Sequence, residues 1–449
     1  MTIQTDKPKS KSISPWAYVP SLYFAEGMPY TVVNIIFGIA AKNLGISNSE
    51  ITKWTNIVAL PWVIKMFWSP IVDTYLTKRK WMIITQFIMF CLLALLAFSF
   101  QLNNFFLISV IILGVIATVS ATFDIATDGY YMQALNPDQQ AKFVGIRSLA
   151  YRLAILFGLG ILVVLAGKLT QNFEISISLS WTITIGILAV LSAILFIFHS
   201  LFLPVPNTES EYNQASRPNN AAFVEVIRSF FSKRRVAAII AFILLYRLGE
   251  AMLEAVAKLF VIDALEASEL ARIQAQGGVI ASEAEKLATA FATEQVGFIF
   301  GTFGLIGVSL GGILGGFLIS KYGLKKCLLP MALVLNIPNM FYVYMASVKP
   351  QLELFYTLIT IEQFGYGLGF TAFTVYLMYI CKGEYKTSHF AISTGLMALG
   401  MKLPGAVSGT IQTALGYQLF FVLVVLLAIP GILTIFIIPL DEDKEIEAS

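Results

Sequence analysis

Charged residues are scarce in this chain: only 13% of its 449 residues are Asp, Glu, Lys or Arg, about half the usual share of a soluble domain. Apolar residues make up 57%. A soluble helical protein of this length would need more polar surface, and the apolar runs are too long and too regularly spaced for one. The composition therefore excludes an ordinary soluble fold, and we expect no nucleic-acid partner.

Cysteine and histidine are also few. Cys91, Cys327 and Cys381 all fall in or beside apolar runs, which argues against a disulfide framework or a Cys-rich metal site. His199 and His389 are too few and too far apart to suggest a metal site. The chain has no P-loop, which argues against ATP-driven transport within it, and no Ser/His/Asp or Cys/His catalytic arrangement. We expect no cofactor, no metal and no enzymatic activity.

Apolar segments of about 20 residues or more recur along the whole length instead. Each must be helical, because unpaired backbone N–H and C=O groups cannot be left in hydrocarbon. We predict an all-α membrane protein with twelve transmembrane helices. Their approximate bounds are 16–41, 54–72, 81–101, 105–131, 143–167, 179–203, 236–262, 296–320, 326–347, 352–381, 386–411 and 415–439.

A polar stretch divides these spans into six and six. It contains Pro204, Pro206 and Pro218 and resembles a linker between two helical bundles. The predicted organisation is a tail (1–15), an N-terminal bundle (16–203), a linker (204–235), a C-terminal bundle (236–439) and a second tail (440–449). Residues 263–295, rich in Ala, Glu and Gln, should form two short helical pieces broken at Gly277-Gly278. The predicted topology places this insertion on the extracytoplasmic side. There it lies at the membrane interface, caps the outer vestibule, or has no function.

Basic residues indicate the orientation. They concentrate in the N-terminal tail and in alternate loops, at 78–80, 228–235 and 321–326, and are sparser in the loops between. The N-terminus has no cleavage site of a signal peptide before the first apolar stretch. We predict that both termini are cytoplasmic.

Two loops suggest an internal repeat. Residues 69–80 follow the second span and residues 315–326 follow the eighth, and each combines a helix end, a tight turn and a basic cluster. The second is similar to a loop of major facilitator transporters, with Ser320 where an acid is usual. The matching positions indicate two six-helix halves that rock about a midplane site. The predicted gating residues are Asp73, Lys78, Arg79, Lys321 and Lys325, although simple positive-inside anchoring is the alternative.

Ionisable residues occur inside the spans, where each costs about 2.5–3.5 kcal/mol on insertion scales. They should therefore face the bundle interior, in pairs or in water. The members of this set are Glu26, Lys65, Asp124, Asp128, Arg147, Arg152, Arg247, Glu250, Glu254, Glu362 and Lys402.

Asp124 and Asp128 are four residues apart, which places both carboxylates on one face of the fourth span. Like charges this close favour proton uptake by one of them. A proton-coupled carrier needs such a group. The alternative is ion pairing with Arg147 and Arg152 of the fifth span, which would only hold two helices together.

Arg247, Glu250 and Glu254 form a similar series on the seventh span. We expect Arg247 and Glu250 to face the cavity, whereas Glu254 lies nearer the outer end, where solvation alone would explain it. Lys65 and Lys402 would neutralise acids or bind an anionic substrate. Lys65 has the alternative of extending to the cytoplasmic surface.

Glu26 lies beside Gly27 and Pro29, which should weaken the helix and free backbone groups to line a cavity. Glu362 precedes a G-x-x-x-G pair at 365–369, whose ordinary role is close helix packing. Several aromatic residues could stack on sugar rings or anchor the chain at the membrane interface. These are Tyr30, Trp62, Trp68, Tyr246 and Tyr366.

Several motifs together carry a family resemblance. They are Phe67-Trp68-Ser69-Pro70 with Asp73, Asp124-Ile-Ala-Thr-Asp128-Gly, Tyr151-Arg152-Leu153, Tyr246-Arg247-Leu248-Gly249-Glu250-Ala251, Glu362 with its glycine-rich helix, and Phe390-Ala391. The chain resembles the AmpG-like muropeptide permeases of the major facilitator superfamily, which are grouped with acetyl-coenzyme A transporters. The matches are spread over roughly 16–440. The 263–295 segment is longer than expected for this family.

The resemblance implies proton-driven import of an N-acetylglucosaminyl-anhydro-N-acetylmuramyl peptide across a bacterial inner membrane, for peptidoglycan recycling. We assign proton coupling to Asp124, Asp128 and Glu26. The expected partners are this small molecule, protons and the bilayer, and we expect a monomer. Lys402 lies one residue from the expected cation of the family. The predicted substrate-binding residues are Arg152, Arg247, Glu250, Glu362, Lys402, Tyr246 and Tyr366.

Other functions remain open at this stage. A carrier of the same fold could move acetyl-coenzyme A, a sugar or a drug, and a membrane sensor would bind a ligand without moving it. A strongly cationic cavity would favour a nucleotide thioester, whereas a mainly apolar cavity would favour a drug.

Overall fold

The computed structural model describes residues 14–205, 220–381 and 385–440. Most of the predicted tails and the central part of the predicted linker lie outside this range. Within the described part, all regular secondary structure is helical.

The N-terminal half contains residues 15–202. Its second predicted span is broken where Pro61 and Pro70 interrupt the chain. The elements are α1 (Pro15–Thr31), η1 (Val32–Ile36), α2 (Phe37–Asn43), α3 (Asn48–Val58), α4 (Leu60–Ile64), η2 (Lys65–Phe67), α5 (Ser69–Thr74), α6 (Lys78–Ser99), α7 (Phe105–Ala134), α8 (Pro137–Ile155), η3 (Leu156–Leu162), α9 (Val163–Phe173) and α10 (Ile177–Phe202). Segments η1 and η3 are π-helical turns inside longer helices.

The C-terminal half follows the short helix α12 (Asn220–Phe231). Its last helical run changes direction at Gly416, whose φ of 76° lies in the left-handed region that favours glycine. The elements are α13 (Val236–Leu245), α14 (Leu248–Gln276), α15 (Ala281–Val296), η4 (Gly297–Gly304), α16 (Leu305–Tyr322), α17 (Leu324–Asn336), η5 (Ile337–Asn339), α18 (Met340–Val348), α19 (Leu352–Tyr379) and α20 (Lys386–Thr434).

In the described part of the chain, nine helical runs are long and apolar enough to cross a membrane. Run α20 contains two predicted spans, joined at the Gly416 kink. The predicted span 352–381 is the continuous helix α19, and the span 54–72 falls in the broken series α3 to α5. The all-helical membrane fold is confirmed, and the count of twelve spans stays a prediction.

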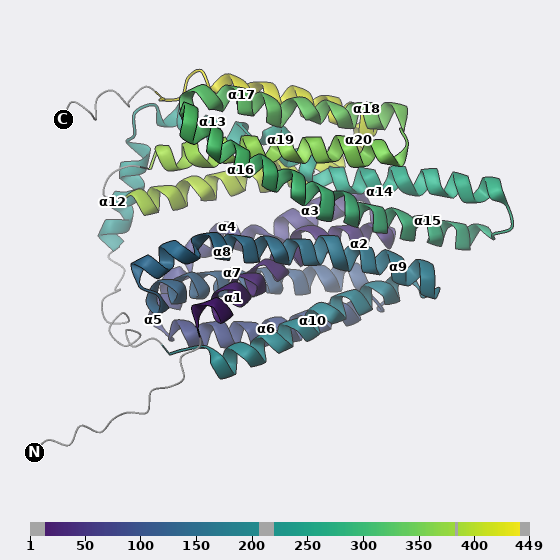
Figure 1. Ribbon diagram of the computed structural model, residues 1–449, viewed down its shortest axis with the longest axis horizontal. Helices are drawn as coiled ribbons and strands as arrows, with labels where there is room; N and C mark the ends of the chain where they lie inside the picture. Colours follow the sequence, from purple (N-terminus) through teal and green to yellow (C-terminus); the bar gives the residue numbers. More distant parts are fainter. Residues whose placement is uncertain (1–13, 206–219, 382–384, 441–449) are drawn as a thin grey trace, which may run out of the picture.

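The two halves lie side by side, with the N-terminal half in purple and blue and the C-terminal half in green and yellow (Figure 1). Helix α12, the start of α1 and the end of the last helical run α20 lie at one end of the bundle, which we call the linker end (Figure 1). The turn between α14 and α15 projects from the opposite end, which we call the hairpin end (Figure 1).

Residues 263–295 belong to this hairpin. Helix α14 continues without a break to Gln276, and α15 begins at Ala281 and packs against α14. The chain reverses at Gly277 and Gly278, which have φ values of 70° and 84°. The break falls at the predicted glycines, but the two pieces extend the seventh and eighth spans and are not separate short helices.

The halves are joined mainly toward the hairpin end. There α3 packs against α20, and α9 packs against α15. One hydrophobic core contains residues of both halves, among them Ile51, Leu159, Val256 and Phe420. Two other cores each belong to one half, one built around Tyr130 and the other around Tyr376. The structure is therefore closed between the halves at one end and divided at the other.

Polar contacts reinforce this closure. Lys42 forms a salt bridge with Asp263 at 2.7 Å, and the hydroxyl of Tyr417 donates a hydrogen bond to the same carboxylate. The Asn48 amide donates to Gln412 Oε1 at 2.8 Å and to the Tyr417 hydroxyl at 2.7 Å. We call these five residues the hairpin-end network.

Candidate functional site

The two aspartates of α7 are each paired with a cation. Lys65 Nζ lies 3.3 Å from Asp124 Oδ2. Arg147 Nη2 lies 2.8 Å from Asp128 Oδ1, which also accepts a hydrogen bond from the Tyr23 hydroxyl at 2.9 Å. The pairs bring together α7, the turn η2 and α8.

The four side chains of these two pairs differ in their exposed fraction. The Asp124 side chain is 10% exposed, whereas those of Lys65, Arg147 and Asp128 are 35%, 33% and 44% exposed. Three of the four groups therefore keep contact with solvent, as expected of residues beside a water-filled path. Arg152 pairs with neither aspartate. Its Nη1 atom instead donates a hydrogen bond to Ser309 Oγ of the other half at 3.1 Å.

Glu26 is the third acid of this cluster. It lies on α1 within Coulombic range of both aspartates and both of their cations. Its Oε2 atom is buried, and no hydrogen-bond partner for it is found among the described residues. A buried polar atom without a partner is costly. Asp124 Oδ1 is likewise buried without a hydrogen-bond partner, but Asp124 has an ion-pair partner at Oδ2, whereas no ion pair of Glu26 occurs among the described residues.

Arg247 is the central cation of the C-terminal half. Its side chain is 4% exposed, and Nη2 donates to the Tyr366 hydroxyl at 2.9 Å and lies 4.0 Å from Glu254 Oε2. The guanidinium also lies over the rings of Tyr366 and Phe370, at 5.2 and 4.9 Å from the ring centroids. The hydrogen bond and the attraction of the cation to the two rings hold the guanidinium in place.

Glu250 and Glu362 are the most buried acids here, at 3% and 1% exposure. Glu362 Oε2 accepts hydrogen bonds from the Tyr342 hydroxyl at 3.3 Å and from Gln363 Nε2 at 3.0 Å. Glu362 Oε1 and Glu250 Oε2 are buried and lack a partner in the described part of the chain.

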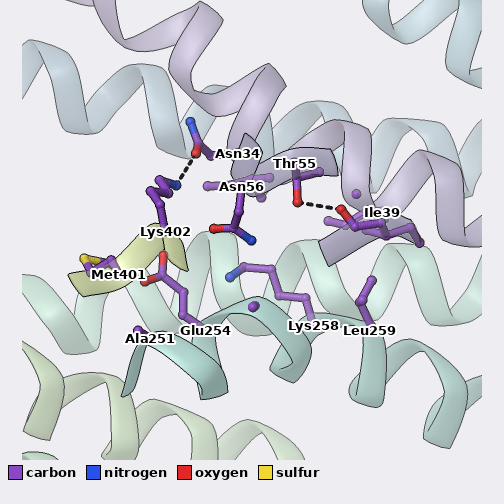
Figure 2. Close-up of a pocket in the computed structure, with 14 residues that line it drawn as sticks. Asn34, Ile39, Thr55, Asn56, Ala251, Glu254, Lys258, Leu259, Met401 and Lys402 are labelled. Carbon is purple, nitrogen blue, oxygen red and sulfur yellow. Dashed lines mark hydrogen bonds between the residues drawn. The ribbon is translucent and has the colours of Figure 1, made fainter. Parts of the chain in front are cut away.

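A pocket between the two halves lies next to these groups. It has a volume of about 60 Å³ and is lined by residues of η1, α2 and α3 on one side and of α14 and α20 on the other. Figure 2 shows Asn56, Glu254 and Lys258 directed into one space, with Lys402 reaching Asn34. Lys402 Nζ donates to Asn34 Oδ1 at 2.6 Å. The pocket thus offers two cations, an anion and amides, but it is smaller than the ~300–1,000 Å³ of typical ligand pockets.

A larger pocket, of about 480 Å³, lies at the hairpin end between α14, α15, α18, α19 and α20. Its lining includes Asp263 and Tyr417 of the hairpin-end network, together with Glu269 and Lys349. No pocket was predicted here, although Phe291 and the lining residues between 263 and 269 belong to segment 263–295, for which capping of the outer vestibule was one predicted alternative.

The predicted aromatic residues have different surroundings. Tyr246 is 1% exposed, its hydroxyl donates to the Gly369 carbonyl at 3.2 Å, and its ring stacks on Phe373. Its position is that of a packing residue, and its predicted role in binding remains a prediction. Tyr366 instead orients Arg247.

The predicted gating residues lie at the linker end. Arg79 donates to the carbonyl oxygens of Ser200 and Leu203 at the end of α10, and Lys78 Nζ donates to the Val72 carbonyl. These bonds fix the ends of helices within the N-terminal half. Lys321 and Lys325 are exposed, and the side chain of Asp73 lies outside the described part of the chain.

Sequence reasoning overlooked part of the site. Lys258 was not among the ionisable residues predicted inside the spans, and Glu254 was expected to lie nearer the outer end, yet both line the central pocket. Asn34 and Asn56 are neutral, so a search for charges inside spans could not find them. The sequence feature that could have identified Asn34 and Asn56 is an amide side chain within an otherwise apolar segment.

The chain was compared with known proteins. A family model described as Major Facilitator Superfamily matches residues 21–280 and 270–448. A relative named AmpG 4 from Rickettsia felis is 23% identical over 425 residues, covering 92% of this chain and 93% of the relative. The anhydromuropeptide permease of Escherichia coli K12 is 24% identical over 428 residues, covering 93% and 78%.

Solved structures agree with this family match. A bacterial homologue of the human lysosomal transporter Spinster, in an inward-facing and unoccupied conformation, superposes with a TM-score of 0.67 at 15% identity, over 93% of this chain and 95% of that one. The family match spans nearly all of the sequence, and the predicted resemblance is confirmed. This chain belongs to the major facilitator superfamily and is a multi-pass membrane transporter of small molecules.

Proposed function

We propose that the chain imports peptidoglycan-derived anhydromuropeptides across the bacterial inner membrane, driven by protons and working by alternating access. The observation that carries this proposal is the acid cluster of the N-terminal half. Asp124 and Asp128 each have a cation partner, while Glu26 Oε2 is buried without one. Glu26 therefore binds the coupled proton, and the aspartates keep Lys65 and Arg147 in place.

The substrate class fits the central pocket and the permease relatives. An anhydromuropeptide carries carboxylates, an amino group, acetamido groups and sugar hydroxyls. Lys402 and Lys258 suit its carboxylates, Glu254 its amino group, and Asn34 and Asn56 its amide groups. A terminal portion of the peptide would enter the narrow pocket, and the remainder would lie toward the half-exposed acid cluster.

The predicted orientation makes the linker end cytoplasmic, because the basic clusters at 78–80, 233–235 and 321–326 lie there. The halves then share a core toward the outside and have separate cores toward the cytoplasm. Release of the hairpin-end network would open the opposite path. We propose that a monomer carries out the whole cycle.

Uptake of labelled anhydromuropeptide into proteoliposomes tests this function. With acid outside, the wild-type protein should accumulate substrate against its gradient, and excess unlabelled muropeptide should compete whereas acetyl-coenzyme A should not. Glu26→Gln should lose accumulation but keep exchange of labelled for unlabelled substrate, because exchange needs no net proton movement. Glu353→Gln, at an exposed acid on α19, is the matched control.

Each part of the proposal can fail separately. Wild-type uptake that ignores the pH gradient refutes proton coupling. Uptake of acetyl-coenzyme A in place of muropeptide refutes the substrate. If Glu26→Gln accumulates labelled substrate to the wild-type level, Glu26 does not bind the coupled proton.

A further inference from the structure

Two acids in the interior of the C-terminal half have no explanation in the transport site described above. Glu250 on α14 and Glu362 on α19 are 3% and 1% exposed, and each has a buried carboxylate oxygen without a partner among the described residues. Leaving two ionised carboxylates in this state would be strongly unfavourable. At least one of them must be neutralised.

The two acids differ in their hydrogen-bond donors. Glu362 Oε2 accepts from Tyr342 and Gln363, which stabilise a negative charge. No donor to Glu250 occurs among the described residues, and its strongest charged neighbour is Glu362. The proton therefore belongs on Glu250, beside a charged Glu362.

We propose that Glu250 and Glu362 form a proton-binding pair in the C-terminal half, separate from the acid cluster around Glu26. For its role in transport, this inference rests on the proposed function. The proton-binding pair itself can be tested without any substrate.

The charges around the pair suggest how proton binding would favour substrate binding. The charged or titratable groups that interact with the pair are Arg247 at the N-cap of α14, Glu254 and Lys258 on α14, Tyr342 on α18 and Tyr366 on α19. Lys402 on α20 and Tyr30 on α1 interact with Arg247 and Glu254 beside the adjacent pocket. With Glu250 protonated, the three cations outnumber the two remaining carboxylates. The adjacent pocket then attracts an acidic substrate, and loss of the proton removes that attraction.

The helical spacing connects the pair to the pocket. Glu250, Glu254 and Lys258 recur every four residues, so they lie on one face of α14, and each step is about 6 Å along the axis. Glu254 and Lys258 line the pocket. A proton on Glu250 therefore acts on the pocket from one helical turn away.

Infrared spectroscopy of the purified full chain in lipid nanodiscs tests the proton-binding pair. The carbonyl stretching band of protonated carboxyl groups is recorded at neutral pH in sodium-free buffer. We expect the wild-type minus Glu250→Gln difference spectrum to contain this band, and we expect the band to persist in Glu362→Gln. Glu353→Gln is the control and should leave the spectrum unchanged.

Several results would overturn the inference. These are a wild-type protein without the band, a band of undiminished intensity in Glu250→Gln, or a band that sodium ions abolish, since sodium would then be the bound cation. Glu26→Gln removes the other proposed proton-binding acid and should keep the Glu250 band, so a Glu26→Gln protein without the band overturns the inference even if Glu250→Gln does not fold. In proteoliposomes, Glu250→Gln should move fewer protons per substrate molecule than wild type, and an unchanged ratio contradicts a role in coupling. Wild-type protein that takes up no muropeptide, while the Glu26→Gln variant still shows the band, refutes the proposed function and leaves the proton-binding pair intact.

Discussion

At the scale of single residues, Asp124 and Asp128 differ in their cation partners and in their exposure to solvent. Both sit on one face of α7, but Asp124 is 10% exposed and Asp128 is 44% exposed. Water can solvate Asp128 when its cation is lost, whereas Asp124 depends on Lys65. The two ion pairs should therefore differ in their contribution to stability.

Lys65→Met should destabilise the protein by about 1–3 kcal/mol, because it leaves a buried carboxylate without its partner. Adding Asp124→Asn should restore most of the loss, since an amide carries no charge to solvate. Thermal unfolding of the single and double variants in detergent measures both effects. A double variant no more stable than Lys65→Met would show that the Lys65–Asp124 pair is not what stabilises this region.

Lys402→Met tests substrate contact in the central pocket. It should raise KM about tenfold or more and change kcat little, because a hydrogen bond to a charged group contributes about 1.5–3 kcal/mol. Initial rates of uptake in proteoliposomes provide the measurement. Lys53→Met, at an exposed lysine on α3, is the control, and equal KM values for the two variants would exclude Lys402 from binding.

At the scale of elements, the two halves meet where π-helical turns face one another. Segment η3 packs against η4. A Cβ atom on Gly301 would lie 2.4 Å from the Gly160 nitrogen, so only glycine permits this approach of the two backbones. The small residues allow helices of opposite halves to pack closely in the membrane.

Gly301→Ala should therefore force the two backbones apart, lower the unfolding temperature and reduce transport. Gly316→Ala on α16 is the matched control, since a Cβ there meets nothing within 4 Å. The control should be neutral or slightly stabilising, because alanine favours a helix over glycine by about 1 kcal/mol. Similar unfolding temperatures for the two variants would contradict the close contact between η3 and η4.

At the scale of the whole molecule, the arrangement of cores defines one conformational state. The halves share a core toward the hairpin end and have separate cores toward the linker end. The hairpin-end network adds polar contacts at the same place. Transport requires these contacts to break and the linker end to close.

A disulfide across the hairpin end tests this requirement. Ser49 Oγ and Thr410 Oγ1 lie 2.6 Å apart on opposite halves, which is close enough for a cysteine pair to be tried. Ser49→Cys with Thr410→Cys, in a chain whose native Cys91, Cys327 and Cys381 are replaced by serine, should lose uptake on oxidation. A reducing agent should restore it, and each single-cysteine chain should be insensitive to oxidation. Full activity of the cross-linked protein would refute rocking at this interface.

Much of the fold could be predicted from the sequence, and less of the site. The break at Gly277-Gly278 followed from local chemistry, because two adjacent glycines favour a turn. The continuity of α14 through residue 263 could not be predicted from local chemistry, because charged and alanine-rich turns can extend a helix as well as end it. The pairing of Arg147 with Asp128 was one of two open alternatives, whereas Arg152 reached Ser309 of the other half.

The sequence alone determined that this chain is a helical membrane protein with two related halves. Hydrocarbon permits only helices of sufficient length in such apolar runs, and that constraint acts on each segment separately. Only the tertiary structure decided which acid meets which cation, which acids stay unpartnered, and that Lys258, Asn34 and Asn56 line one pocket. Those outcomes depend on how each helix is rotated and where it crosses its neighbours, and close packing of the whole bundle sets both.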